Sequence, residues 1–161
     1  MYFLGLDVGS SSVKAALVDS KSGKSIQSVH EPKSEMSISS LKNDWAEQDP
    51  NVWWKYTCSA IKRVCKESNI NPKKIISIGI SYQMHGLVIV DKDGKTIRDS
   101  IIWCDSRAVN IGNDAFKKLG EDKCMSHLLN SPGNFTASKL KWVKENEPEV
   151  YDKIHKYMLP G

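Results

Sequence analysis

No apolar run in this sequence of 161 residues approaches the roughly 18 residues that a membrane-spanning helix needs, so we expect no membrane partner. No basic region precedes Asp7, which argues against a secretory signal. No C-x-x-C spacing occurs among the four cysteines, so neither a zinc site nor a redox pair is indicated: Cys58, Cys65, Cys104 and Cys124. Together these absences predict a reduced, cytoplasmic setting.

The sequence also lacks a strong charge of either sign. Its 23 basic and 19 acidic residues leave a formal net charge of +4. The basic pairs at 73–74 and 117–118 form no stripe with interleaved aromatic residues, so we expect no nucleic-acid partner. The hydrophobic share of 40% and the charged share of 26% are those of a globular domain, and the length predicts one domain or most of one.

Hydrophobic periodicity predicts strands early in the chain and helices later. Alternating or continuous apolar runs indicate strands over 2–6, 13–18, 25–29, 74–81, 87–90 and 100–103, with the start of another at 157–159. Spacing of 3.6 residues and start signals indicate helices from Pro50, over 108–119, over 136–146 and at Pro148. We expect residues 30–48 to form a loop, Trp53 and Trp54 to be core residues, and 74–81 to be buried on both faces. This order predicts a mixed sheet in an α/β domain.

The turn from Asp7 to Ser12 joins two predicted strands and has the composition of a phosphate-binding loop. Gly9 permits close approach of the backbone, and serine hydroxyls with successive N–H groups can surround phosphate oxygens. Asp7 can hold Mg²⁺ directly or through water, and Lys14 can neutralise phosphate charge. The spacing is neither a Walker A loop nor G-x-G-x-x-G. An ordinary hairpin with a solvent-facing aspartate is the alternative.

Two further segments follow predicted strands at the edge where open α/β sheets bind ligands. In the first, His85 can donate a hydrogen bond to a polyol hydroxyl while Met84 packs on its carbon backbone; the alternative is a structural histidine. In the second, Trp103 can stack on a sugar face while Asp105 and Arg107 fix its hydroxyls. The alternative for that segment is a structural Asp-Arg ion pair.

Together these segments resemble the N-terminal part of the FGGY carbohydrate kinases. The motifs that carry the resemblance occur in order along the whole chain: Gly5–Lys14, Glu47–Pro50 with Trp53 and Trp54, Gln83–Gly86, Ile102–Arg107 and Thr136–Asn146. The Met84-His85 pair resembles that of the members acting on D-xylulose, whereas glycerol-specific members carry an Arg-Glu pair there. Asn134 departs from the family signature, which usually has glycine or another permitted residue at that position.

The resemblance implies an actin-like, ribonuclease-H-like ATPase domain with a mixed five-stranded sheet flanked by helices. It implies ATP and Mg²⁺ as cofactors and D-xylulose as the substrate, which would become D-xylulose 5-phosphate. Asp7 takes the position of the Mg-ATP aspartate. The nucleotide-binding residues carried over are Gly9, Ser11, Ser12 and Lys14, and the sugar-binding residues are Met84, His85, Trp103 and Asp105.

Family members are roughly three times longer than this sequence, so residues 1–161 are expected to be an incomplete N-terminal domain. The aspartate base and the second domain would lie beyond it, and the isolated chain is expected to be inactive. An edge strand left open by the incomplete sheet is able to pair with a second copy, giving a homodimer. Two alternatives remain: a kinase of the same family for another ketose, polyol or sugar acid, and a non-catalytic sugar or nucleotide sensor on the same fold.

Overall fold

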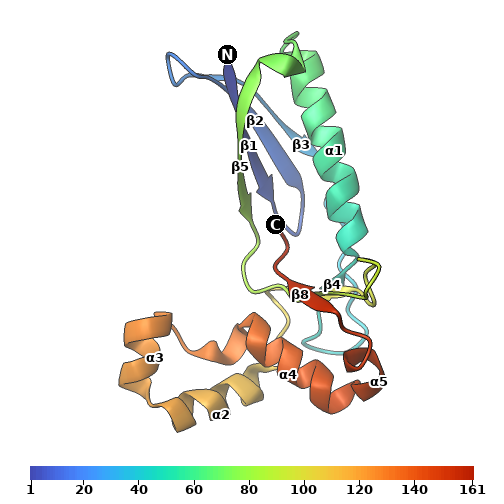
Figure 1. Ribbon diagram of the computed structural model, residues 1–161, viewed down its shortest axis with the longest axis vertical. Helices are drawn as coiled ribbons and strands as arrows, with labels where there is room; N and C mark the ends of the chain where they lie inside the picture. Colours follow the sequence, from blue (N-terminus) through green and yellow to red (C-terminus); the bar gives the residue numbers. More distant parts are fainter. The chain divides into compact units, whose positions relative to one another are not determined.

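The structure is a computed structural model that describes all 161 residues, and these fall into two units (Figure 1). The first, here called the sheet unit, comprises Met1–Ser37, Pro50–Gln83 and Gly161. The second, the helical unit, comprises Ile38–Asp49 and Met84–Pro160. Each unit is described separately below.

The sheet unit is built on a four-stranded mixed sheet in the order β3-β2-β1-β5. Its strands are β1 (Tyr2–Val8), β2 (Val13–Asp19), β3 (Ser25–Glu31) and β5 (Ile75–Tyr82). The first three form an antiparallel meander, and β5 lies parallel to β1. The α/β class and the mixed sheet are therefore confirmed. The sheet has four strands and not five, because the later strands pair among themselves in the helical unit.

One long helix, α1 (Pro50–Glu67), covers the sheet next to β2 and β3. It begins at Pro50 as predicted, where the missing proline N–H has no partner to lose. The stripe at helical spacing is buried: Trp53, Thr57, Ala60, Val64 and Cys65. Trp54 is 70% exposed, so its assignment to the core was wrong. Adjacent helix residues point about 100° apart, and only one of the two tryptophans can face the sheet.

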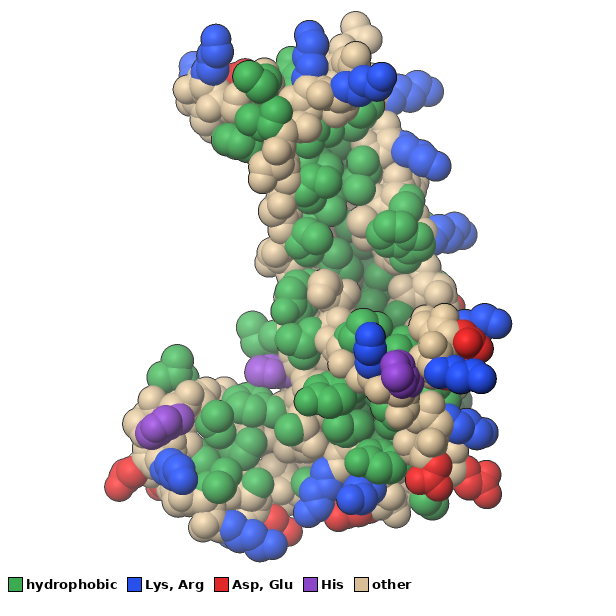
Figure 2. Space-filling view, viewed as in Figure 1, with side chains coloured by type: hydrophobic (Ala, Val, Ile, Leu, Met, Phe, Trp, Pro, Cys, Tyr) green, Lys and Arg blue, Asp and Glu red, His purple; other side chains and the backbone are tan.

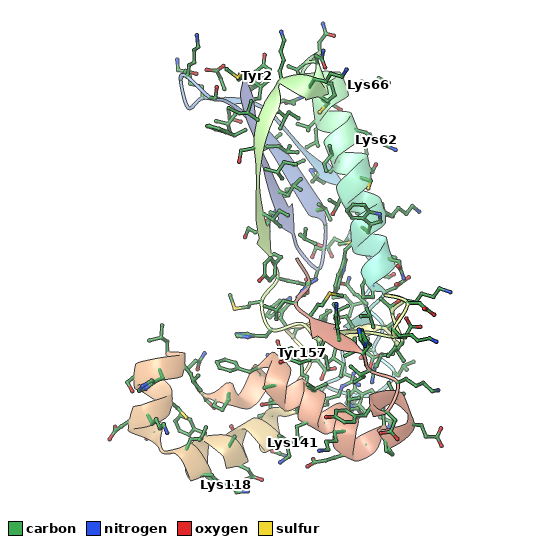
Figure 3. All side chains as sticks on the ribbon, viewed as in Figure 1. Tyr2, Lys62, Lys66, Lys118, Lys141 and Tyr157 are labelled. Carbon is green, nitrogen blue, oxygen red and sulfur yellow. The ribbon has the colours of Figure 1, made fainter.

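The opposite side of α1 is solvated, and its ends are tied to the sheet by polar contacts. Figure 3 shows Lys62 and Lys66 on the side of α1 that faces away from the strands. Arg63 is the exception, because its guanidinium lies 2.9 Å from the Glu31 carboxylate at the end of β3 and 2.7 Å from Glu67. Partly exposed pairs of this kind add little to stability, and the Arg63–Glu31 pair mainly fixes the helix over the outer strands.

The strand β5 is exposed, contrary to the expectation that both its faces are buried. Ile76, Ile78 and Ile80 are each more than half exposed, and Figure 2 shows hydrophobic side chains along the viewed face of this part of the molecule. The cause is position, because β5 is the edge strand and α1 packs on β2 and β3 instead. A continuous β-branched run predicts the strand correctly but not what covers it.

The helical unit surrounds a small core made by Leu87, Ile89, Ile101 and Val143. Its helices are α2 (Val109–Leu119), α3 (Glu121–Leu128), α4 (Thr136–Asn146) and the short α5 (Pro148–Tyr151), with a 3₁₀ turn, η2, at Pro132–Asn134. Its strands are β4 (Glu47–Gln48), β6 (Val88–Val90), β7 (Ser100–Ile101) and β8 (Lys156–Met158). Strand β4 pairs with β7, and β6 pairs with β8, both antiparallel.

The predicted helices over 108–119 and 136–146 and the helical turn after Pro148 are confirmed within a residue. Helix α3 was missed, because its eight residues are too few to show a clear apolar stripe. Within the predicted loop over 30–48, residues 47 and 48 form the buried strand β4. None of the helices has the combination of length and apolar character needed to cross a membrane.

Candidate functional sites

The Asp7–Ser12 turn is a tight hairpin at the end of β1 in the sheet unit. Asp7 pairs in register with Lys14 on β2, and the Lys14 Nζ lies 3.1 Å from the Asp7 carboxylate. Both side chains are well exposed. The turn is closed by a 3.1 Å hydrogen bond from the Gly9 N–H to the Ser12 carbonyl. A carboxylate and an ammonium thus sit side by side at the mouth of the turn.

Glycine suits the narrowness of this hairpin at position 9. A Cβ there would lie 3.1 Å from the Ser12 carbonyl oxygen, tighter than nine in ten real Cβ contacts, so the backbone would have to shift by a few tenths of an ångström. The Ser11 carbonyl accepts a 2.8 Å hydrogen bond from the Met36 N–H, so the chain after β3 braces the turn. The result is a backbone corner with a carboxylate ligand beside it, which fits the donor set that Mg²⁺ and phosphate groups use.

Gln83 is a residue of this site for which no sequence pattern predicted a role. Its backbone N–H donates a 2.9 Å hydrogen bond to the Val8 carbonyl, which places the end of β5 beside the turn. Its side chain is 9% exposed, and neither amide atom has a hydrogen-bond partner. A buried amide without partners costs free energy, so such groups commonly meet water or a ligand. In the sequence, Gln83 is only one residue of the Gln83–Gly86 motif. Its burial, which the structure shows, is the observation that marks it as a residue of the site.

In the helical unit, Met84, His85 and Gly86 form a corner of the backbone. His85 has a left-handed backbone with φ +61°, and its ring stacks on Phe135 with 4.7 Å between ring centroids. Met84 is 64% exposed. Burial, and secondarily the Lys139 charge, lower the pKa of His85 below its ordinary value. At neutral pH the ring is therefore uncharged and can both donate and accept a hydrogen bond.

Helix α4 holds this corner with a buried cation. The Lys139 side chain is fully buried, and its Nζ donates hydrogen bonds to the carbonyls of His85 at 3.0 Å and Asn134 at 2.8 Å, and to the Asn134 Oδ1 at 3.2 Å. Burial lowers the pKa of Lys139 to about 8. The Thr136 hydroxyl adds a hydrogen bond to the Gly86 carbonyl. The sequence placed Lys139 in a motif but did not predict this contact.

The two predicted sugar-binding residues of the segment after β7 differ in their exposure to solvent. Trp103 is 47% exposed and available to a ligand. Asp105 is fully buried, and its carboxylate accepts hydrogen bonds from the Arg107 guanidinium at 2.7 to 3.0 Å and from the Ala46 N–H at 2.6 Å. The alternative of an Asp-Arg ion pair is therefore present. A direct contact of Asp105 with a sugar would require this network to open.

The Asp105–Arg107 pair belongs to a larger buried network. Arg107 also lies 2.6 Å from the Glu47 carboxylate and packs against the Trp45 ring, 3.7 Å from its centroid. Arg98 joins the Glu47 and Glu147 carboxylates. These contacts connect β4, the segment after β7 and the end of α4. No spacing in the sequence signals them, because the partners are about fifty to sixty residues apart.

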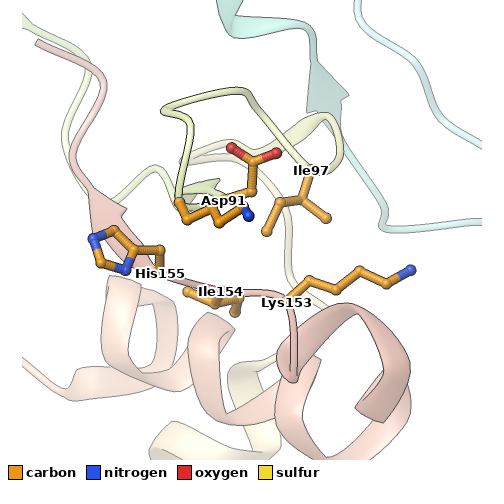
Figure 4. A pocket seen from close by; sticks show the side chains of 6 residues that line it. Asp91, Ile97, Lys153, Ile154 and His155 are labelled. Carbon is orange, nitrogen blue, oxygen red and sulfur yellow. The ribbon is translucent and has the colours of Figure 1, made fainter.

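The helical unit also has a shallow pocket lined by Asp91, Ile97, Lys153, Ile154 and His155, among others (Figure 4). The Asp91 carboxylate accepts hydrogen bonds from the backbone N–H groups of its own turn, at Asp93 and Lys95. Both bonds go to the Asp91 Oδ1, so this oxygen is engaged within its own turn. The predicted residues lie elsewhere: Asp7, Gly9, Ser11, Ser12 and Lys14 in the sheet unit, and Met84, His85, Trp103 and Asp105 in the helical unit.

Comparison with known proteins gives a consistent result over the whole chain. It is 34% identical over 160 residues to a xylulose kinase of Staphylococcus xylosus, covering 99% of this chain and 32% of that protein. The crystal structure of a xyloylose kinase from Brucella ovis matches with a TM-score of 0.86 and 33% identity, over 99% of this chain and 32% of that one. That of a gluconate kinase from Lactobacillus acidophilus matches with a TM-score of 0.84 and 27% identity, over 99% and 31%.

The chain thus spans about a third of the length of these relatives. The model of the N-terminal domain of the FGGY family of carbohydrate kinases matches residues 2–161. These similarities agree with the ordered motifs, the α/β fold and the mixed sheet. The chain therefore belongs to the FGGY family of carbohydrate kinases and corresponds to the N-terminal domain of that family.

Proposed function

We propose that this chain is the N-terminal part of an ATP-dependent kinase that transfers the γ-phosphoryl group of Mg-ATP to a hydroxyl of D-xylulose. The observation that carries the proposal is the exposed Asp7 carboxylate beside the narrow Gly9 turn, together with the Met84-His85 corner. The first has the donor set for a metal-bound phosphate, and the second has the mixed apolar and polar character of a sugar contact.

Each part has a separate task in phosphoryl transfer. Asp7 would hold Mg²⁺ directly or through water, with Gly9, Ser11 and Ser12 around the phosphates. Lys14 would neutralise phosphate charge, since its Nζ already lies beside Asp7. Met84 and Trp103 would contact the carbon skeleton of the sugar, and neutral His85 would hydrogen-bond a hydroxyl. Bound Mg²⁺ and lysine stabilise the charge that develops on the transferred group.

We assign no base within residues 1–161 to the proton of the attacking hydroxyl. We therefore also propose that the isolated chain binds Mg-ATP and the sugar but does not catalyse phosphoryl transfer between them. A coupled assay of sugar-dependent ADP release is expected to show no turnover above background with this chain. Robust turnover would mean that a base among these residues has been overlooked.

A sugar acid is the second candidate substrate, because a gluconate kinase is among the structural matches. The chemistry of the corner favours a neutral sugar instead. The Met84-His85 corner has a neutral imidazole, and its one neighbouring ammonium, Lys139, is buried and bonded to carbonyls. A carboxylate would need an accessible cation. Binding of D-xylulose but not D-gluconate is the expected result, and the reverse order of affinity would reassign the substrate.

Asp7→Asn is expected to weaken Mg-ATP binding by the isolated chain about tenfold, since the amide keeps the shape but loses the charge that attracts the metal. Isothermal titration with Mg-ATP measures this. Asp114→Asn is the matched control, because it removes the same charge from an exposed site on α2. Equal affinities for all three proteins would remove Asp7 from the nucleotide site.

His85→Ala is expected to weaken D-xylulose binding about fivefold, which corresponds to the loss of one hydrogen bond of about 1 kcal/mol. Mg-ATP affinity should stay unchanged, because the proposed nucleotide residues lie in the sheet unit. Titration of both ligands against both proteins separates the two effects. If sugar affinity is the same in the variant, His85 is a structural histidine.

A further inference from the structure

We propose that Lys139 and Asn134 are positioning residues for the sugar site, joining the His85 corner to the Trp103 segment through one buried ammonium. The proposal rests on the assignment of His85 and Trp103 to the sugar. It goes beyond that assignment because neither Lys139 nor Asn134 is among the residues assigned to the sugar. A chain of hydrogen bonds within the helical unit carries it.

The first link is the bond between Lys139 and the corner. Its Nζ donates to the His85 carbonyl at 3.0 Å, and the fully buried side chain has no route to solvent. Beside it, Phe135 stacks on the His85 ring and Thr136 donates to the Gly86 carbonyl. On its other side, Gly86 is packed so closely that a Cβ there would lie 2.5 Å from a Pro160 ring carbon. The corner is therefore held mainly by the first turn of α4.

The second link runs through Asn134, the residue at which this sequence departs from the family signature. Its Oδ1 accepts a 3.2 Å hydrogen bond from the Lys139 Nζ, and its Nδ2 donates to the Trp103 carbonyl. Both ends of one amide are engaged, so the side chain cannot turn over without losing both bonds. A glycine at this position would keep the 3₁₀ turn but would not reach Trp103.

The count of donors and acceptors explains why the residue is a charged lysine. The ammonium has three N–H donors, and it faces three acceptors: the carbonyls of His85 and Asn134 and the Asn134 Oδ1. A neutral amine has two N–H donors and a lone pair, so one acceptor would lose its donor. The bridge is complete only when Lys139 is protonated.

The charge also acts on His85. Together with burial it lowers the pKa of the imidazole and keeps the ring neutral. Burial has the largest effect on Lys139 and brings its pKa to about 8, while the Asp105 charge raises that pKa and the Arg107 charge lowers it. Burial raises the pKa of the neighbouring Cys104 thiol, which therefore stays neutral in this range. The ammonium therefore loses its proton within a pH range that is open to experiment.

Amide hydrogen exchange without any ligand tests the bridge directly. Lys139→Met is expected to raise exchange about tenfold at Leu87, which follows the corner and donates its N–H to the Ile101 carbonyl, and at Asp105, which follows the Trp103 segment and donates its N–H to the Ile102 carbonyl, since local opening follows the loss of buried bonds. It should also raise the pKa of His85, measured by NMR titration of the ring. Asn134→Ala should raise exchange at Asp105 while leaving Leu87 protected.

Lys141→Met is the matched control. Lys141 lies on the same helix and loses the same charge, but it is exposed and pairs only with Glu145, 3.5 Å away. It should change neither exchange nor the pKa of His85. Unchanged exchange at Leu87 in a folded Lys139→Met variant would overturn the proposal.

If Lys139→Met does not fold, the unaltered chain provides the test through pH. Exchange at Leu87, the protected amide that follows the corner, should rise between pH 7 and pH 9 relative to helix α1 after correction for its intrinsic pH dependence. The folded pKa of about 8 is below the ordinary 10.5, so this group alone makes the fold more stable as pH rises above 8. A local rise in exchange is therefore not global unfolding. No rise at the corner would overturn the proposal.

Binding of D-xylulose separates this proposal from the one on which it rests. If the unaltered chain binds the sugar, Lys139→Met should weaken binding and Lys141→Met should not. If the unaltered chain binds no sugar at all, the assignment of the corner to D-xylulose falls, while the exchange results still decide whether Lys139 and Asn134 hold it.

Discussion

Replacing Asp105 by Asn is expected to lower the free energy of unfolding of the helical unit by about 3–5 kcal/mol, the usual cost of removing one partner from a buried ion pair. The carboxylate is fully buried and accepts bonds from the Arg107 guanidinium and from the Ala46 N–H. An amide has one acceptor oxygen, and its NH₂ would face the donors of Arg107. The Arg107 charge would then be buried with poorer compensation.

Urea denaturation followed by tryptophan fluorescence measures the effect, because Arg107 packs between Trp45 and Trp142. The control is Glu145→Gln, which removes a carboxylate from an exposed pair with Lys141 and should cost less than about 0.5 kcal/mol. A change of similar size in both variants would show that the buried pair is not the stabilising element. The result bears on function, since Asp105 shapes the segment that carries Trp103.

A double-mutant cycle measures the interaction energy between Asp105 and Arg107. Arg107→Met alone removes the guanidinium from the buried Asp105 carboxylate, leaves Glu47 with Arg98 only, and should also be strongly destabilising. Combined with Asp105→Asn, it should cost less than the sum of the two single changes, because no unpaired charge of the pair remains. Additive costs would mean that the two residues act independently.

The sequence predicted elements well wherever a local signal exists. The start of α1 follows from Pro50 and a stripe of apolar residues, and the strands of the meander follow from alternation with period two. What the sequence could not show is which surface each element meets. Ile78 and Ile80 read as buried but lie on an edge strand that no helix covers, and Trp54 reads like Trp53 but faces solvent.

The same limit applies to the site residues. Motifs located the turn at Asp7, the corner at His85 and the junction at Asp105, because each follows a strand whose pattern is clear. They did not show that the Asp105 carboxylate is enclosed, or that Lys139 reaches the His85 carbonyl across fifty-four residues of sequence. Those facts depend on long-range packing, which no local spacing encodes. The roles of the site residues in binding remain predictions, as does the homodimer.

Gly112→Ala is expected to destabilise the helical unit by about 3 kcal/mol, at the upper end of the usual cost of overpacking. Gly112 lies in α2 and is buried against the turn η2. A methyl group there would lie 2.5 Å from the Gly133 backbone nitrogen and would also overlap the Gly133 Cα and the Pro132 carbonyl. All three are backbone atoms, so no side chain can turn aside. The helix and η2 would have to separate.

This cost opposes the ordinary benefit of alanine in a helix, which is about 1 kcal/mol over glycine. Gly79→Ala is the control, because no atom lies within 4 Å of a Cβ at that exposed position in β5. It should leave stability unchanged or raise it slightly. Because η2 contains Asn134, separation should also raise amide exchange beside Trp103 in Gly112→Ala. A variant as stable as the parent would show that α2 and η2 do not approach as closely as described, and would weaken the positioning of Asn134 with it.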